Sequence, residues 1–426
     1  NFISGLLNKN SQDLHASGQV IGVQDEEFGQ LDSSINQKWF LLGDQFTLEQ
    51  QLLEFTVPLT SSQVTLLEKD PQNTITYTIN ENGDPVTLPT TLDSDSVYKA
   101  VINTSSFKPG VYTIQATATI ENKEWSSAIH TFYVSYPVYV TWTIDWEGYD
   151  VKDEYLADMA QIADDHQMPL THFFNPRIYT NSDISNERAD YLTHWVLDRK
   201  TSHGDMIGLH LHMFPDMVEA AGVTPIEEPV VWGSTLTDGY DILAANYGYE
   251  DMVKMLDWSK ETFSNHQLGT PTIFRAGGWY ADMDVLKAVN DTGFIADSSG
   301  RTKYEFGEKK IQGFWDLSIV TQPYHPNIYD QNISTGPSLS ILEIPNNGAD
   351  SWMFSSQQMI DRFNQNKPNL ISDKNMMVTY LSHPEWFKTD KPKMEAVFDY
   401  IDQYKFDNDN GPVLYVTLEE TYNIWE

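Results

Sequence analysis

The sequence contains no cysteine, and this absence excludes several kinds of site. None of the 426 residues can form a disulfide, bind zinc through a thiolate or act as a thiol nucleophile. The chain also lacks any apolar run near the roughly 18–20 residues that a membrane-spanning helix requires. We therefore expect no transmembrane segment, and a metal site in this chain has to use histidine and carboxylate ligands.

Positive charge is scarce as well. Lysine and arginine number 26 against 61 aspartates and glutamates, which gives a formal net charge of -35. Such a field repels phosphate backbones and anionic lipid surfaces, so nucleic acid is not expected as a partner. The negative charge is compatible with neutral or cationic partners. The sequence begins at Asn1 and shows no export signal, and we expect an extracellular, cell-surface or periplasmic protein whose signal has been removed.

The composition and length predict a folded chain with more than one domain. Hydrophobic residues make up 40% and aromatic residues 13% of a chain too long for one ordinary core. Residues 1–45 are polar and mixed, which indicates an N-terminal extension. Residues 46–136 contain short alternating stretches separated by turn residues, which predicts an all-β accessory domain, a sandwich of immunoglobulin or fibronectin type. The expected strands are 62–67, 74–79, 97–102, 110–120 and 129–134.

From residue 137 to 426 the pattern changes to strands that alternate with helices. Repeated βα units of this kind predict an α/β domain with a parallel sheet, here long enough to close as a barrel. The expected strands are 138–144, 170–174, 206–212, 272–275, 339–344, 376–381 and 413–416, and the expected helices are 151–166, 186–200, 250–265, 282–291, 355–365 and 391–404.

Two pairs of metal-competent side chains stand at the ends of expected strands. Asp145 and Glu147 follow the strand 138–144, and His210 and His212 end the strand 206–212. Residues two apart on a strand point to the same face, so each pair can act together. Two imidazoles and a carboxylate, with one position left open, are the ligand set of a hydrolytic zinc site.

Arg275 and His383 also fall at the ends of expected strands. In parallel barrels the chemistry lies at the carboxyl ends of the strands, so all six side chains are expected on one face. Taken singly, each residue has an ordinary structural alternative: a surface acid, a salt-bridge partner or a turn histidine. Their common position favours a functional site.

The order of these motifs resembles that of the NodB-type polysaccharide deacetylases, carbohydrate esterase family 4 and its relatives, over about residues 138–426. The family's Thr-Phe-Asp-Asp-Gly corresponds to residues 143–148, Thr-Ile-Asp-Trp-Glu-Gly. Its histidine motif corresponds to residues 204–212, its arginine motif to Phe-Arg-Ala-Gly-Gly-Trp at 274–279, and its Leu-x-His to 381–383. The resemblance implies a distorted barrel of about seven β/α units. The sequence departs from the family because its acids are separated by a tryptophan and its histidines are two residues apart.

The resemblance also implies roles for these residues. Asp145 would be the general base and Glu147 the metal ligand with His210 and His212, although the two acids could have exchanged roles, with Asp145 as a ligand. The metal would be a divalent ion, with zinc the leading candidate. Arg275 would keep Asp145 ionised, and His383 would protonate the departing amine. Asp297, after an apolar strand, would orient His383, but a turn-capping role is open.

Three tryptophans lie beside these motifs and are candidates for binding sugar rings, whose C–H faces pack on aromatic rings. They are Trp146, Trp279 and Trp386. Core packing is their ordinary alternative role.

The leading hypothesis is therefore a metal-dependent hydrolase that removes N-acetyl groups from an N-acetylhexosamine-containing polysaccharide. An O-acetyl esterase or small-amide hydrolase on the same site is the alternative among enzymes. A catalytically inactive glycan-binding protein is the alternative outside them. The acetylated glycan, the native metal and the oligomeric state are not specified by the sequence.

Overall fold

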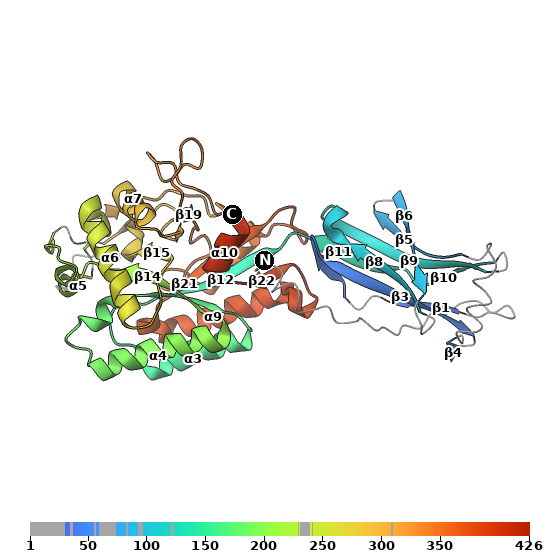
Figure 1. The fold of residues 1–426 in the computed structure, drawn as a ribbon, viewed down its shortest axis with the longest axis horizontal. Coiled ribbons are helices and arrows are strands. Elements are labelled where there is room, and N and C mark those ends of the chain that lie inside the picture. The colour runs from blue at the N-terminus through green and yellow to red at the C-terminus, as the bar shows by residue number, and fades with distance from the viewer. Residues whose placement is uncertain are drawn as a thin grey trace. The chain divides into compact units, whose positions relative to one another are not determined.

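A computed structural model provides the structure (Figure 1). It describes residues 30–34, 37–54, 57–58, 74–81, 84–92, 97–120, 123–228, 230, 239–240, 242–307 and 310–426. The described residues form two compact units. The first contains those up to Pro137 with Asn369–Asn375 and Tyr404–Pro412, and the second contains Val138–Pro368, Met376–Gln403 and Val413–Glu426. None of the described helices combines the length and the apolarity that a membrane span needs.

The first unit consists of two β-sheets, ordered β1-β3-β8-β7 with β4 beside β3, and β2-β11-β9-β5-β6 with β10 beside β9. Alternate residues of β9 are buried, from Tyr112 to Ala118, as expected for a strand with one face toward a core. The immunoglobulin or fibronectin assignment stays a prediction. The strands are β1 Gln30–Ser34, β2 Trp39–Leu41, β3 Gln45–Glu54, β4 Val57–Pro58, β5 Thr74–Glu81, β6 Asp84–Pro89, β7 Thr91–Leu92, β8 Val97–Asn103, β9 Gly110–Ile120, β10 Lys123–Ser126 and β11 His130–Ser135.

The N-terminal extension expected over residues 1–45 overlaps this unit. Residues 1–29 lie outside the described residues, as does the expected strand 62–67. The structure places β1 and β2 in the sheets instead of in an extension. The side chains of β2 are buried, and this three-residue apolar run is too short to produce a recognisable strand pattern.

The second unit is built on a parallel sheet with strand order β19-β16-β15-β14-β13-β12-β21-β20, and β22 also pairs with β12 (Figure 1). The predicted parallel α/β sheet is therefore confirmed. Residues of β12 are buried along its whole length, as a central strand of a parallel sheet requires. The strands are β12 Val138–Asp145, β13 Leu170–Phe174, β14 Met206–Leu211, β15 Ile273–Ala276, β16 Ala296–Asp297, β19 Leu342–Glu343, β20 Ala349–Asp350, β21 Met376–Ser382 and β22 Val413–Tyr415. The hairpin of β17 Glu305–Phe306 and β18 Ile311–Gln312 stands apart.

The two edges of this sheet are joined by a short stretch of chain. Strand β19 lies at one edge and β20 at the other, and only residues 344–348 separate them in sequence. Such a segment spans at most roughly 20 Å, so the sheet has to curve until its edges approach each other. The described strands thus form a partial barrel, and the segment 344–348 bridges its seam.

Helices alternate with the strands as the sequence predicts. In α4 a serine side chain caps the first turn, and Gly204 ends the helix in the left-handed conformation with φ 78°. Helices α5 and α10 were not expected from the sequence. The helices are α3 Asp153–Asp165, α4 Asn186–His203, α5 Pro215–Ala220, α6 Tyr249–Asn265, α7 Met283–Asp291, α8 Ser356–Asn366, α9 Phe387–Ile401 and α10 Leu418–Trp425.

The hydrophobic core of the second unit includes residues at the beginnings of its strands. Tyr139 is the second residue of β12, and Met206 and Ile273 start β14 and β15; all three belong to one buried cluster with Leu418 of α10. Apolar side chains therefore fill the amino end of the barrel. The carboxyl ends of the strands remain available for a polar site.

Candidate active site

Two histidines and one glutamate form the centre of the site. His210 lies in β14, His212 follows its last residue, and Glu147 stands two residues after the end of β12. Strands β12 and β14 flank β13 in parallel, so their carboxyl ends meet at the same edge of the sheet. All three side chains are buried, with exposed fractions of 3% or less.

The potential ligand atoms of these residues converge. His212 Nε2 lies 2.5 Å from Glu147 Oε2, and His210 Nε2 lies 3.7 Å from Glu147 Oε1. One ligand atom from each of the three residues lies within 4.8 Å of the others. Among the described residues, His210 Nε2 has no hydrogen-bond partner. Buried polar atoms without a partner are rare, and two imidazoles with a carboxylate fit a divalent cation such as zinc.

Backbone carbonyl groups fix the orientation of both imidazoles. His210 Nδ1 lies 3.0 Å from the Arg275 carbonyl oxygen, and His212 Nδ1 lies 2.7 Å from that of Tyr240. An N–H at each Nδ1 donates to these carbonyls, which leaves the Nε2 lone pairs directed at the centre. The Tyr240 ring also stacks on His212 with centroids 4.3 Å apart. This is how metal-binding histidines are held in proteins.

A glycine provides the space that His212 occupies. A Cβ on Gly277 would lie 2.7 Å from the imidazole of His212. The sequence reads Arg275-Ala-Gly-Gly at this point, and the segment follows β15 directly.

The surrounding charges make Glu147 an anion in the absence of metal. Burial alone raises the pKa of this carboxyl, but the positive charges of His212 and His210 beside it outweigh burial and hold the pKa well below its ordinary value. Burial lowers the pKa of His210, yet the charges of Asp145 and Glu147 leave it raised overall. The site thus favours positive charge beside Glu147.

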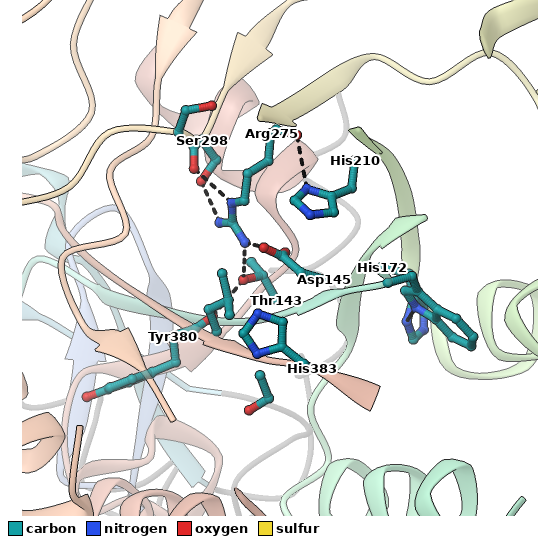
Figure 2. Close-up of polar contacts among 12 residues, drawn as sticks. Thr143, Asp145, His172, His210, Arg275, Ser298, Tyr380 and His383 are labelled. Carbon is teal, nitrogen blue, oxygen red and sulfur yellow. Dashed lines mark hydrogen bonds and ion pairs between the residues drawn. The ribbon is translucent and has the colours of Figure 1, made fainter. Parts of the chain in front are cut away.

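Asp145, the last residue of β12, is bound by Arg275 from β15 (Figure 2). Arg275 Nη1 donates to Asp145 Oδ1 and to Thr143 Oγ1, both at 2.7 Å. Its Nε and Nη2 donate to the backbone and side-chain oxygens of Ser298 at 2.8 Å. Arg275 is fully buried, and its guanidinium also lies over the Phe173 ring. Four hydrogen bonds therefore fix the cation that holds Asp145.

His383 reaches the same centre from the end of β21. Its Nε2 lies 3.3 Å from Glu147 Oε1, and it forms with Asp145 and Glu147 a second group of potential ligand atoms within 4.8 Å. The structure thus brings together six residues that the sequence placed at strand ends, namely Asp145, Glu147, His210, His212, Arg275 and His383.

Asp297 does not take the place expected for it. It hydrogen bonds with Glu343, its neighbour in the paired strands β16 and β19, and accepts hydrogen bonds from Ser299 N and Oγ. The prediction that Asp297 orients His383 is not supported by any contact among the described residues. Burial raises the pKa of both acids, and for Glu343 the negative Asp297 raises it further. The pair therefore favours a bound proton, and it accepts hydrogen bonds from Ser299 and Gly300, which follow the Ser298 that binds Arg275.

The three candidate tryptophans have different positions. Trp146 is fully buried against Phe174 and Trp195, and its Nε1 donates to His172 Nδ1 at 3.4 Å. It is a core residue, because alternation turns it away from the face that carries its two acidic neighbours. Trp279 and Trp386 line the cavity over the site.

This cavity has a volume of about 580 Å³ and includes residues that the sequence analysis missed. Trp352, with an exposed fraction of 52%, and Tyr240 are two of them. Glu385 is a third, and it accepts a hydrogen bond from Glu147 N at 2.8 Å. Burial and the nearby charge of Glu147 raise the pKa of Glu385 well above its ordinary value. Glu385 could have been found from the sequence, because it stands two residues after His383. No motif near Trp352 or Tyr240 pointed to the site.

No family model and no curated protein matches the sequence. Comparison with solved structures finds a candidate polysaccharide deacetylase from Mycobacterium smegmatis, with 12% identity over 68% of this chain and 90% of that chain and a TM-score of 0.42. A peptidoglycan deacetylase from Bacillus subtilis matches with 10% identity over 68% and 92% of the two chains and a TM-score of 0.33.

A family 4 acetyl xylan esterase from Clostridium thermocellum, solved with a cobalt ion, matches with 10% identity over 67% and 91% of the two chains and a TM-score of 0.34. The comparison thus returns the family that the sequence motifs resemble. At these identities and TM-scores, the assignment of function rests on the residues of this chain.

Proposed function

We propose that this protein is a metal-dependent hydrolase that removes N-acetyl groups from an N-acetylhexosamine-containing polysaccharide. The observation that carries the proposal is the juxtaposition of Asp145, paired with Arg275, and the converging ligand atoms of Glu147, His210 and His212, of which the buried His210 Nε2 has no hydrogen-bond partner among the described residues. Glu147, His210 and His212 would hold the metal. When bound, a divalent metal supplies a Lewis acid and an activated water molecule to such a site.

Asp145 is the general base in this proposal. Its Oδ1 is occupied by Arg275, which positions the carboxylate and keeps it beside a fixed cation. The carboxylate accepts a proton as water attacks the acetyl carbonyl. Arg275 itself is fixed by Thr143 and Ser298, so the base cannot turn away without breaking several hydrogen bonds.

His383 is the general acid in this proposal. Its Nε2 lies 3.3 Å from Glu147 Oε1, and it belongs with Asp145 and Glu147 to one group of converging atoms. An amine is a poor leaving group unless it is protonated as it departs, so amide cleavage requires such a donor. The ring of Trp386 packs beside His383, at 5.5 Å between centroids, and limits where the imidazole can point.

The lining of the cavity supports a carbohydrate substrate. Trp279, Trp352 and Trp386 lie around the acidic and histidine residues, and aromatic rings are suitable surfaces for pyranose rings. The strongly negative chain is unsuited to an anionic polymer. We further propose that the protein acts outside the cytoplasm on such a glycan, with the β-sheet unit as an accessory domain.

Acetate release from a panel of N- and O-acetylated glycans tests the proposal, with metal analysis of the same preparation. We expect about one divalent metal per chain, acetate release from N-acetylated glycans, and loss of both after treatment with a chelator. Release from O-acetylated glycans alone would make the protein an esterase. A metal-free protein that binds glycan without releasing acetate would contradict the proposed activity.

A further inference from the structure

We propose that a buried chain of three residues, Trp146, His172 and Asp205, positions the two acids of the site. The acids are Asp145, the base, and Glu147, the metal ligand. This inference rests on the proposed function and adds positioning residues to it. The chain begins at the tryptophan that separates the two acids, which is where this sequence departs from the family that it resembles.

The position of Trp146 between the two acids gives its side chain influence over both. Strand β12 ends at Asp145, and one further backbone hydrogen bond, from Trp146 N to Phe173 O at 2.9 Å, continues its pairing with β13. Beyond this bond, Glu147 N donates to the Glu385 side chain and not to a strand. The acids share a face as long as Trp146 stays on the other. Anchoring the indole therefore helps to direct both carboxylates.

The indole of Trp146 is anchored by packing and by one polar contact. It is fully buried against Phe174 and Trp195. Its Nε1 donates to His172 Nδ1 at 3.4 Å, and the His172 ring also packs against Trp195 at 5.5 Å between centroids. The hydrogen bond is long, so packing holds the indole and His172 directs it.

His172 connects this anchor to the strand that carries the histidine ligands. Its Nδ1 receives the Trp146 N–H, so its Nε2 carries the ring hydrogen and donates to Asp205 Oδ2 at 2.9 Å. Asp205 directly precedes β14 and accepts a hydrogen bond from Leu170 N, at the start of β13. Figure 2 shows His172 apart from the group around Arg275. The chain thus links β12, β13 and β14 away from the reacting centre.

Arg199 of α4 completes the network and balances its charge. Its Nε donates to Asp205 Oδ2 at 2.9 Å, and its Nη2 donates to Oδ1 at 3.3 Å. His172, Asp205 and Arg199 are all buried, with exposed fractions of 4% or less. Apolar side chains of similar volume could fill this space without the cost of burying charges. The direction that the hydrogen bonds impose on Trp146 is therefore the better explanation of the network.

A network that served stability alone would leave the metal site unaffected when it is broken. His166 provides the matched control, because it is a buried histidine whose Nδ1 lies 2.8 Å from Asp402 Oδ2 at the end of α3. The probe is zinc alone, and its dissociation constant is measured by competition with a chelating dye. Thermal melting of the chelator-treated variants measures stability, and acetate release gives kcat and KM.

His172→Leu should weaken zinc binding about 10- to 100-fold, the usual effect of losing a residue that supports a ligand, and lower kcat more than it raises KM. Trp146→Phe keeps an aromatic ring and removes the N–H, so it should weaken zinc binding about twofold to tenfold, as for one hydrogen bond. His172→Gln offers an acceptor and a donor and should recover part of the loss. His166→Leu should lower the melting temperature and leave the affinity for zinc unchanged.

Unchanged zinc binding in Trp146→Phe and His172→Leu, or equal weakening in His166→Leu, would overturn the inference and leave the proposed function intact. If His172→Leu does not fold, Trp146→Phe decides. Zinc binding that falls in both variants of a protein that releases no acetate would support the inference and overturn the proposed activity. An unaltered protein that binds no zinc would overturn both.

Discussion

Glu147 and Glu343 are both buried in the same partial barrel, yet the pKa of one is lowered and the pKa of the other is raised. Burial raises the pKa of each carboxyl. Glu147 faces two imidazoles, and its pKa ends well below the ordinary value, whereas Glu343 faces Asp297, and its pKa ends well above it. The neighbours therefore decide which buried acid carries a charge. One is suited to bind a cation, and the other to hold a proton.

The largest expected effect comes from exchanging each of these glutamates for glutamine. Glu147→Gln removes the charged ligand, so bound metal and acetate release should both fall by more than the roughly 10- to 100-fold typical of residues that only support a ligand. Glu343→Gln is the matched control, because its amide can donate to Asp297 and its oxygen can still accept from Gly300 N. Metal content per chain and acetate release are the measurements.

Equal loss of metal in both glutamine variants would remove the distinction between the two glutamates. It would mean that the Asp297–Glu343 pair is as necessary for the metal as the ligands themselves. Circular dichroism and thermal melting of both variants establish that the loss is local.

Asp145 sharpens the comparison, because it is a buried acid that has an arginine as its partner. Asp145→Asn should retain the metal and lower the rate of acetate release about 10²–10⁴-fold, the usual worth of a positioned base. The substitution also leaves Arg275 buried with fewer anionic contacts, so stability is measured in parallel. If Asp145→Asn loses the metal and Glu147→Gln keeps it, the two acids have the reverse roles.

A substitution of His383 tests whether the residues around Glu147 also include the general acid. His383→Ala should slow the cleavage of an N-acetyl amide far more than that of an aryl acetate, since a phenolate leaves without protonation. The two rates and their pH profiles are compared, and the amide profile should lose its alkaline limb. Equal slowing of the two substrates would assign His383 to the surroundings of the metal.

The smallest expected effect is on stability, and it has opposite signs for the two glutamates. The raised pKa of Glu343 means that the folded chain holds a proton that the unfolded chain releases above about pH 4.3, so stability falls as pH rises above this value. Glu343→Gln should remove that fall. The lowered pKa of Glu147 stabilises the folded chain above about pH 4.3, and this stabilisation is lost as pH falls through the pKa of the folded state. In Glu147→Gln, stability should no longer fall with pH for this reason.

Denaturant midpoints of chelator-treated protein across pH 3–8 measure both slopes, and each unit of pKa difference is worth about 1.4 kcal/mol. A Glu343→Gln variant with the same pH dependence as the unaltered protein would show that the acid pair does not titrate in the folded state.

The sequence was sufficient to place the site residues that lie at the carboxyl ends of strands. Asp145, His210 and Arg275 end apolar runs, and the carboxyl ends of parallel strands meet, so their convergence follows from local pattern and topology. The same alternation places Trp146 opposite Asp145 and Glu147, so its burial was predictable by the argument that found its neighbours.

Other residues of the site depend on long-range packing that no local period reveals. Asp297 and Glu343 meet because β16 and β19, each two residues long, are neighbours in the sheet. Trp352 reaches the cavity from a segment beyond the seam, and Tyr240 reaches it from the long connection after α5. Such strands and connections are too short or too irregular to have a period, and the partner of Asp297 could not be chosen from sequence alone.

Gly277 sets a limit on how this protein can be altered by selection or by engineering. The imidazole of His212 fills the space of any side chain at that position, and it cannot withdraw because Tyr240 holds it by a carbonyl and by its ring. Even alanine would have to displace a ligand. In a library of variants, codon 277 should therefore tolerate only glycine, while the half-exposed position 352 should accept many residues without loss of the fold.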